Sequence, residues 1–265
     1  FNKETPQEVY DGCFKENAHV IESVKRSGSV KRFVFTSSFA AVSHPRPEGY
    51  VFTEKDWCGD NIEAYKGRWS EAQISENRDI AYAMAKANSE KLIYAEAEAD
   101  GSFEALAILP LHVVGPLIAP NHDQPWSWQN HIKGMMLGKA YRGGREGRML
   151  WNAADVRDVA RAHRLGIETT IGSNGSRYIM AAADRSGEMY TWQLQALLES
   201  MYPMVDEIGG EPMVEDMPVK PTYDAPRAYC LLAMQELGLE PFDIETTIRD
   251  TVDSYYSLGI IGADG

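Results

Sequence analysis

Two short apolar runs, each lying after a helical segment, constrain the fold of this 265-residue chain more than any other feature. They are residues 31–35 (KRFVF) and 103–109 (FEALAIL), and each has the length of a strand. Residues 6–27, which end before Gly28, have apolar side chains at helical spacing, and residues 71–99 are rich in Ala, Glu and Lys. Apolar strands that alternate with helices are typical of parallel sheets. The sequence therefore predicts an α/β fold built on a parallel sheet.

Polar residues follow the first strand, and a Pro- and Gly-bounded segment follows the second. Thr36, Ser37 and Ser38 come directly after the first strand, and the second is followed by 110–115 (PLHVVG). Ligands of parallel sheets bind at the carboxyl ends of the strands, so both segments are candidates for a site. Two roles are open to the hydroxyls. They end the strand by bonding to the backbone, or one of them is held there to bond a substrate oxygen.

After Gly115 the order of elements is less regular. Asp155 and Asp158 open a helix there, the first suited to the N-cap and the second to the first turn, where a carboxylate meets free amides. Residues 44–70 are predicted to be loop, and residues 204–222 are the most linker-like part of the chain. The other predicted elements are a helix near 128–139, strands at 149–151 and 178–181, and helices at 190–201, 224–236 and 241–258.

Composition excludes several classes of partner and site. A net charge of −13 argues against nucleic acid and anionic membranes as the main partners. No apolar run approaches the ~18–20 residues that a membrane span needs. Three distant cysteines, Cys13, Cys58 and Cys230, and six scattered histidines show no ligand spacing, so no metal site is expected. The cysteines form no disulfide framework either, which favours a reducing compartment.

The second long helix contains the sequence YAMAK, which places Tyr82 and Lys86 four residues apart on one helical face. A nearby ammonium group favours the phenolate form and lowers the pKa of a tyrosine. Such a tyrosine can exchange a proton with a carbonyl or hydroxyl oxygen, and a serine at a neighbouring strand end can hold the same oxygen. A lone match to this spacing is weak, because a tyrosine packing on a lysine stem is common on amphipathic helices. Here it lies between two candidate strand ends.

The ordered set of motifs resembles the extended short-chain dehydrogenase/reductase superfamily, and within it the dihydroflavonol reductase and cinnamoyl-CoA reductase group. The resemblance covers nearly the whole chain. It rests on VKRFVFTSS (30–38), TEKDW (53–57), YAMAKANSEKL (82–92), ILPLHVVGP (108–116), SRYIMAA (176–182) and the segment 236–261. It implies a Rossmann-like parallel sheet with a smaller C-terminal α/β substrate domain. Residues 1–115, rejoined by 149–170, would be the remainder of the dinucleotide-binding domain. Residues 116–148 and 171–265 would form the substrate-binding part.

The resemblance also implies roles for individual residues. Tyr82 would be the general acid/base, Ser38 would polarise the substrate carbonyl, and Lys86 would hold the nicotinamide ribose. NADP(H) is the expected cofactor in preference to NAD(H). A loop residue, Ser43, stands where the group places a substrate contact. The expected cofactor contacts are Thr36, Ser37, Tyr82, Lys86, Pro110, Leu111 and Val113.

The chain departs from the group at its N-terminus, where no glycine-rich turn precedes the helix over 6–27. Such a turn normally cradles the dinucleotide pyrophosphate. At about 30 residues for each βαβ unit, we expect roughly 80–90 residues of the domain to lie outside this sequence. Alternatively, a partner chain supplies them, or the chain is a family-derived subunit that lost the cofactor.

The predicted function is the NAD(P)H-dependent reduction of a carbonyl on a small organic substrate, of the dihydroflavonol, cinnamoyl-CoA or aldehyde reductase type. Nucleotide-sugar epimerases or dehydratases and hydroxysteroid-type dehydrogenases share the Tyr–Lys pair and are the alternatives among enzymes. The alternative outside enzymes is a non-catalytic structural subunit of a larger complex. A cytoplasmic location is expected, with an organelle as the other possibility.

Overall fold

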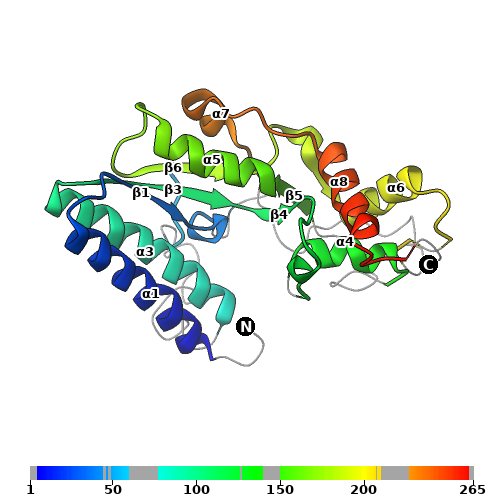
Figure 1. The fold of residues 1–265 in the computed structure, drawn as a ribbon, viewed down its shortest axis with the longest axis horizontal. Coiled ribbons are helices and arrows are strands. Elements are labelled where there is room, and N and C mark those ends of the chain that lie inside the picture. The colour runs from blue at the N-terminus through cyan, green and yellow to red at the C-terminus, as the bar shows by residue number, and fades with distance from the viewer. Residues whose placement is uncertain are drawn as a thin grey trace. The chain divides into compact units, whose positions relative to one another are not determined.

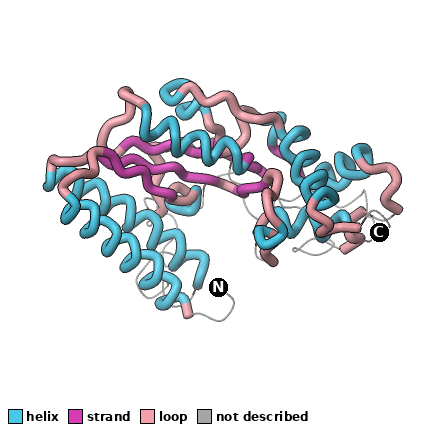
Figure 2. The backbone as a smooth tube through the Cα atoms, viewed as in Figure 1, coloured by secondary structure: helices cyan, strands magenta, loops and turns pink. Residues whose placement is uncertain are grey.

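The computed structural model describes residues 5–43, 46, 49–59, 77–125, 127–139, 150–206, 208–209 and 227–262 (Figure 2). The chain divides into two compact units. The first comprises 1–111, 160–180 and 228–239, and the second comprises 112–159, 181–227 and 240–265. The domain boundaries expected from the sequence stay a prediction. Among the described residues, no helix has the length and apolar character that a bilayer crossing requires.

The first unit is built on a parallel sheet, as the apolar runs predict. Its strands are β1 (Arg32–Thr36), β3 (Glu104–Pro110) and β6 (Ser176–Met180), in the order β1-β3-β6. The pairing places Thr36 opposite Ile108, so the carboxyl ends of β1 and β3 lie side by side. The α/β fold class with a parallel sheet is confirmed, and the adjacent strand ends provide the location for a site.

Two long helices, α1 (Pro6–Ser27) and α3 (Arg78–Asp100), pack together on one face of this sheet (Figure 1). Thr5 and Glu8 form a capping box at the start of α1, and a glycine in the left-handed conformation, Gly28, ends it. Asn77 caps α3 by accepting hydrogen bonds from the first turn. Gly28, the helix stop read from the sequence, is therefore a real C-cap, and the structure adds the N-caps at Thr5 and Asn77.

The opposite face of the sheet is covered by α5 (Val156–Glu168), which begins in the second unit and continues in the first. Gly166 allows the close approach, because a Cβ at this position would lie 3.0 Å from the Leu106 side chain and 3.6 Å from Val34. Three smaller elements belong wholly or partly to this unit and complete it. They are the 3-10 turn η1 (Phe39–Ala41), strand β2 (Val51–Phe52), which pairs with β8 (Arg227–Ala228), and helix α7 (Leu231–Leu237).

The second unit combines a small mixed sheet with helices. Strand β5 (Leu150–Asp155) pairs in parallel with β4 (His112–Val114) and antiparallel with β7 (Glu188–Tyr190). The helices are α4 (Gln129–Met136), α6 (Thr191–Met201) and α8 (Ile244–Ser257), with short 3-10 turns η3 (Pro120–His122) and η5 (Arg185–Gly187). Their apolar faces share one core, whose fully buried members include Ile132, Met135, Leu194, Leu198, Val252 and Tyr255.

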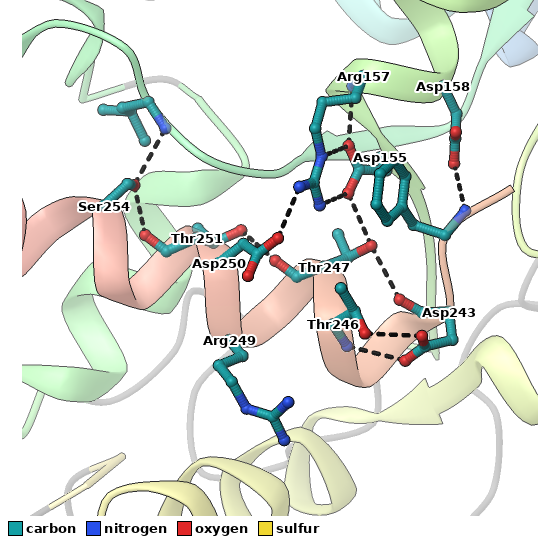
Figure 3. A network of polar contacts seen from close by, with 12 residues as sticks. Asp155, Arg157, Asp158, Asp243, Thr246, Thr247, Arg249, Asp250, Thr251 and Ser254 are labelled. Atoms are coloured by element: carbon teal, nitrogen blue, oxygen red, sulfur yellow. Dashed lines mark hydrogen bonds and ion pairs between the residues drawn. The ribbon is translucent and has the colours of Figure 1, made fainter.

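A polar network within the second unit explains the two aspartates at the start of α5 (Figure 3). Asp155 accepts a hydrogen bond from the Arg157 backbone N–H at 2.8 Å, as expected of an N-cap. The Arg157 guanidinium also pairs with Asp155 and with Asp250 of α8. Asp158 is buried in the first turn and accepts from the Phe242 N–H at 2.8 Å. The capping role is confirmed, and the network also binds α8.

Some element bounds differ from those predicted. The helix expected at 224–236 begins only at Leu231, because Ala228 lies in β8 and is paired with β2. Strand β6 begins at Ser176, two residues before the predicted start, where it pairs with β3. The predicted loop over 44–70 and the linker over 204–222 lie mostly outside the described residues.

Candidate active site

The segment Thr36-Ser37-Ser38 ends β1 through its backbone. The Ser37 N–H donates to the Ile108 carbonyl of β3 at 2.8 Å and so extends the pairing by one residue. Ser38 is extended and caps η1, its hydroxyl accepting from the Ala40 N–H at 3.2 Å. The predicted role of these residues in ending the strand is therefore confirmed for the Ser37 backbone and for the hydroxyl of Ser38.

Each of the three hydroxyls also has its own side-chain partner. Thr36 Oγ1 lies 2.7 Å from His163 Nε2 of α5. The Ser37 hydroxyl donates to the carboxylate of Glu90 on α3. The Ser38 side chain interacts with the hydroxyl of Tyr82, also on α3, and lowers its pKa. The strand end is thus tied to helices on both faces of the sheet.

Tyr82 and Lys86 lie one turn apart on α3, and both are half-buried. Lys86 Nζ donates to the Thr36 carbonyl at 3.2 Å and lies 5.8 Å from the centre of the Tyr82 ring. Together with the interaction of Ser38 with Tyr82, these contacts bring the three predicted catalytic side chains into one cluster at the end of β1. The cluster lies entirely within the first unit.

Burial dominates the electrostatics of this cluster. Burial raises the pKa of Tyr82 above its usual value, the hydrogen bond from Ser38 lowers it, and the nearby Cys13 raises it. Burial also lowers the pKa of Lys86, against the influence of Cys13 and of Glu90 and Glu16. The sequence predicted a lowered pKa for Tyr82, and this prediction is wrong for the present structure because burial outweighs the favourable contacts.

The other predicted contacts lie at several places. Pro110 and Leu111 are buried at the end of β3, and the Leu111 N–H donates to the Met180 carbonyl at 2.9 Å. Ser43 follows η1 and is half-buried, with its N–H donating to the Phe39 carbonyl. Val113 belongs to β4 of the second unit. The roles of these residues stay predictions.

Comparison with known proteins gives relatives but no family match. No family model matches the chain. A cinnamoyl-CoA reductase of Medicago truncatula is 26% identical over 261 residues, which cover 95% of this chain and 68% of the relative. An uncharacterised oxidoreductase of Schizosaccharomyces pombe is 28% identical over 222 residues, 82% of this chain and 61% of its own length. Vestitone reductase of Medicago sativa is 30% identical over 161 residues, 60% of this chain and 43% of the relative.

Solved structures agree on the fold. A yeast methylglyoxal/isovaleraldehyde reductase in complex with NADPH superposes with a TM-score of 0.72 at 20% identity, over 94% of this chain and 71% of the reductase. Vestitone reductase from alfalfa gives the same TM-score, over 96% of this chain and 74% of its own. The chain resembles the dihydroflavonol and cinnamoyl-CoA reductase group of extended short-chain reductases. The resemblance inferred from the sequence and the Rossmann-like fold are thereby confirmed.

One glycine pattern in this reductase-like chain has the wrong context for a dinucleotide cradle. Gly259, Gly262 and Gly265 have the spacing GxxGxxG. They follow helix α8, whereas a pyrophosphate-binding turn joins a strand to a helix. The spacing is therefore no candidate for the phosphate site.

Sequence reasoning missed two residues that the reductase-like fold brings to the strand end, Glu90 and His163. Glu90 is eight residues after Tyr82 and continues the helical face of Tyr82 and Lys86. A glutamate on that face was the available signal. No local signal pointed to His163, because its contact with Thr36 spans 127 residues of sequence.

Proposed function

We propose that this protein is an NAD(P)H-dependent reductase that converts the carbonyl group of a small organic substrate to an alcohol. The observation that carries the proposal is that Ser38, Tyr82 and Lys86 lie together at the end of a parallel strand, with the Lys86 ammonium bound to the Thr36 carbonyl and 5.8 Å from the centre of the Tyr82 ring. Neither the sheet nor the packing of α3 requires these three polar side chains together. Their chemistry is that of a proton-transfer set.

The strand ends suit a nicotinamide cofactor. Lys86 supplies an ammonium donor for ribose hydroxyls, and the buried Pro110 and Leu111 supply an apolar surface one strand away. Thr36 and Ser37 would approach the cofactor from the end of β1. When bound, the reduced nicotinamide supplies the hydride that adds to the carbonyl carbon. NADP(H) is the proposed form, supported by the NADPH bound to the similar yeast reductase.

The residues of the chain would handle the carbonyl oxygen. Ser38 donates a hydrogen bond to this oxygen and fixes its position. The Tyr82 hydroxyl donates its proton to the oxygen as the hydride arrives, which completes the alcohol. Its raised pKa keeps that proton in place at neutral pH. The Lys86 ammonium then stabilises the phenolate that forms.

The proposal also covers the substrate-binding part of the chain and the cellular location of the protein. Residues 116–148 and 171–265 would contribute the substrate-binding part, with Val113 along the nicotinamide and Ser43 touching the substrate. The wide spacing and odd number of Cys13, Cys58 and Cys230 provide no disulfide framework, which supports a cytoplasmic location, because thiols stay reduced in that compartment.

Turnover of NADPH with a panel of aldehydes, ketones and acyl-CoA thioesters tests the proposal, using the full-length protein. Tyr82→Phe should lower kcat by at least about a hundredfold, since it removes the proton donor. Tyr10→Phe is the matched control. It removes a tyrosine hydroxyl from α1 that accepts a hydrogen bond from Asn88 of α3 at 2.9 Å. Turnover that is equal in both variants would refute the mechanism.

A further inference from the structure

Glu90 is a fully buried carboxyl group that the proton-transfer set does not use. It lies at the third position of one helical face, after Tyr82 and Lys86, and none of its surface is exposed. Burying a carboxylate without compensation is costly, so its contacts show what it is held for.

The two oxygens of Glu90 have different partners. Oε1 accepts from the Ser37 hydroxyl, one residue before Ser38. Oε2 forms a 2.7 Å ion pair with Nε of Arg177, a buried residue of β6. The carboxylate therefore connects the helix that carries Tyr82 to the strand end that carries Ser38.

Arg177 in turn ties a third segment to this point. Its Nη1 donates to the backbone carbonyls of Glu54 at 2.8 Å and Asp56 at 2.7 Å. Its guanidinium lies 3.6 Å from the centre of the Trp57 ring. These contacts use Nη1 and the ring face of the guanidinium, whereas Nε binds Glu90. Arg177 is therefore held in place by the segment of Glu54–Trp57, and it fixes the orientation of the Glu90 carboxylate.

We propose that Glu90, oriented by Arg177, is a positioning residue that fixes Ser38 against Tyr82 through Ser37. This inference rests on the proposed reductase function. Two side chains of α3 hold consecutive residues of the strand end. Lys86 Nζ binds the Thr36 carbonyl, and Glu90 binds the Ser37 side chain. Loss of the Glu90–Ser37 hydrogen bond frees the Ser37–Ser38 peptide to rotate. A displacement of about 1 Å there costs up to roughly a hundredfold in rate.

Glu90 also acts on Lys86 by charge. Its carboxylate raises the pKa of Lys86 and opposes the effect of burial. The other groups that act on the same ammonium from the facing helix are Cys13 and Glu16 of α1. Removing the charge of Glu90 therefore lowers the pKa of Lys86. This effect of charge is separate from the geometric effect of the Glu90–Ser37 contact.

The geometric part is tested with Ser37→Ala in the full-length protein, because this variant keeps the Glu90–Arg177 pair intact. We expect kcat to fall roughly ten- to hundredfold. The matched control is Ser89→Ala, which removes a buried hydroxyl of α3 that accepts from Asn17 at 3.1 Å. Its kcat should equal that of the wild type. Equal kcat in Ser37→Ala, Ser89→Ala and the wild type overturns the inference.

The charge part is tested with Glu90→Gln. We expect the basic limb of the kcat/KM profile to move to lower pH, whereas Ser37→Ala leaves that limb in place. An unmoved limb with full kcat in Glu90→Gln overturns the inference, and if this variant fails to fold, Ser37→Ala decides. A crystal structure of Ser37→Ala is the readout that needs no turnover. An inactive wild type refutes the reductase function, while an unchanged position of Ser38 relative to Tyr82 in that crystal structure refutes the positioning role.

Discussion

A β-strand presents successive side chains to opposite faces, and this alternation separates the roles of the hydroxyls after Phe35. Thr36 contacts His163 on the α5 side, and Ser37 contacts Glu90 on the α3 side. Only Ser38, which follows the strand and caps η1, joins Tyr82. At the scale of single residues, two hydroxyls therefore anchor the strand end and the third is presented to the site.

His112 is the titratable residue for which the structure makes the sharpest prediction. Burial, helped by the neighbouring His131, lowers the pKa of His112 to about 4. Its ring lies 4.0 Å from the centre of the Trp128 ring. A histidine in the unfolded chain has a pKa near ~6.5, so the unfolded state binds the proton first as pH falls. The stability contributed by neutral His112 is complete above about pH 6.5 and is lost as pH falls from there towards 4.

NMR titration of the histidine ring signals measures this directly. The His112 signal should stay that of a neutral ring down to about pH 4, the value that burial sets. A histidine in a short unstructured peptide, with a pKa of ~6.5, is the reference for a solvated ring. A His112 signal that titrates together with that of the reference peptide would contradict the predicted burial effect.

At the scale of elements, Arg157 joins α5 to α8. Its guanidinium pairs with Asp155, whose side chain is 1% exposed, and with Asp250 at 2.6 Å. Thr247 of α8 also donates to Asp155. Arg157→Met would leave the buried Asp155 carboxylate without its main countercharge, which costs about 3–5 kcal/mol for a buried pair. We expect the lower end of that range for the free energy of unfolding, because Arg157 itself is 31% exposed.

Urea denaturation of paired variants checks the value. Arg164→Met is the control, since Arg164 lies on the same helix and pairs with Glu168 at the surface, where it is 61% exposed. That change should alter the free energy of unfolding by less than about 0.5 kcal/mol. Equal losses in the two variants would mean that the Asp155 network does not anchor α8.

Features set by neighbouring residues could be predicted from the sequence, whereas features set by contacts between distant residues could not. The bounds of α1 follow from Thr5, Glu8 and Gly28, all adjacent to the helix they define. Helix α7 was misplaced because Ala228 is drawn into β8 by pairing with β2, a contact that no local pattern encodes. The Glu90–Arg177 pair likewise joins residues 87 apart in sequence. Local caps and periodicity were therefore predictable, and buried polar contacts between distant elements were not.

At the scale of the whole molecule, fold and catalytic set are separate claims. The yeast and alfalfa reductases that superpose on the chain are each 20% identical to it, and a UDP-glucose 4-epimerase from Thermotoga maritima, 18% identical, also superposes, with a TM-score of 0.66. The fold therefore leaves the reaction open. The chain spans 61% of the Schizosaccharomyces pombe relative, so binding of a cofactor by this chain stays a proposal.

Binding of NADPH separates the reductase from a non-catalytic subunit before any substrate is known. A ligand that binds only the folded state stabilises it by about 2.7 kcal/mol at a hundredfold excess over Kd, which raises the Tm. We expect the full-length protein and its Tyr82→Phe variant to show this rise with NADPH. Lys86→Met should show a smaller one, because it loses the ribose donor. Lys15→Met is the control, since Lys15 is a surface residue of α1 that pairs with Asp11. No rise with NADPH in the full-length protein would favour the structural-subunit alternative, because the strand ends would then hold no cofactor.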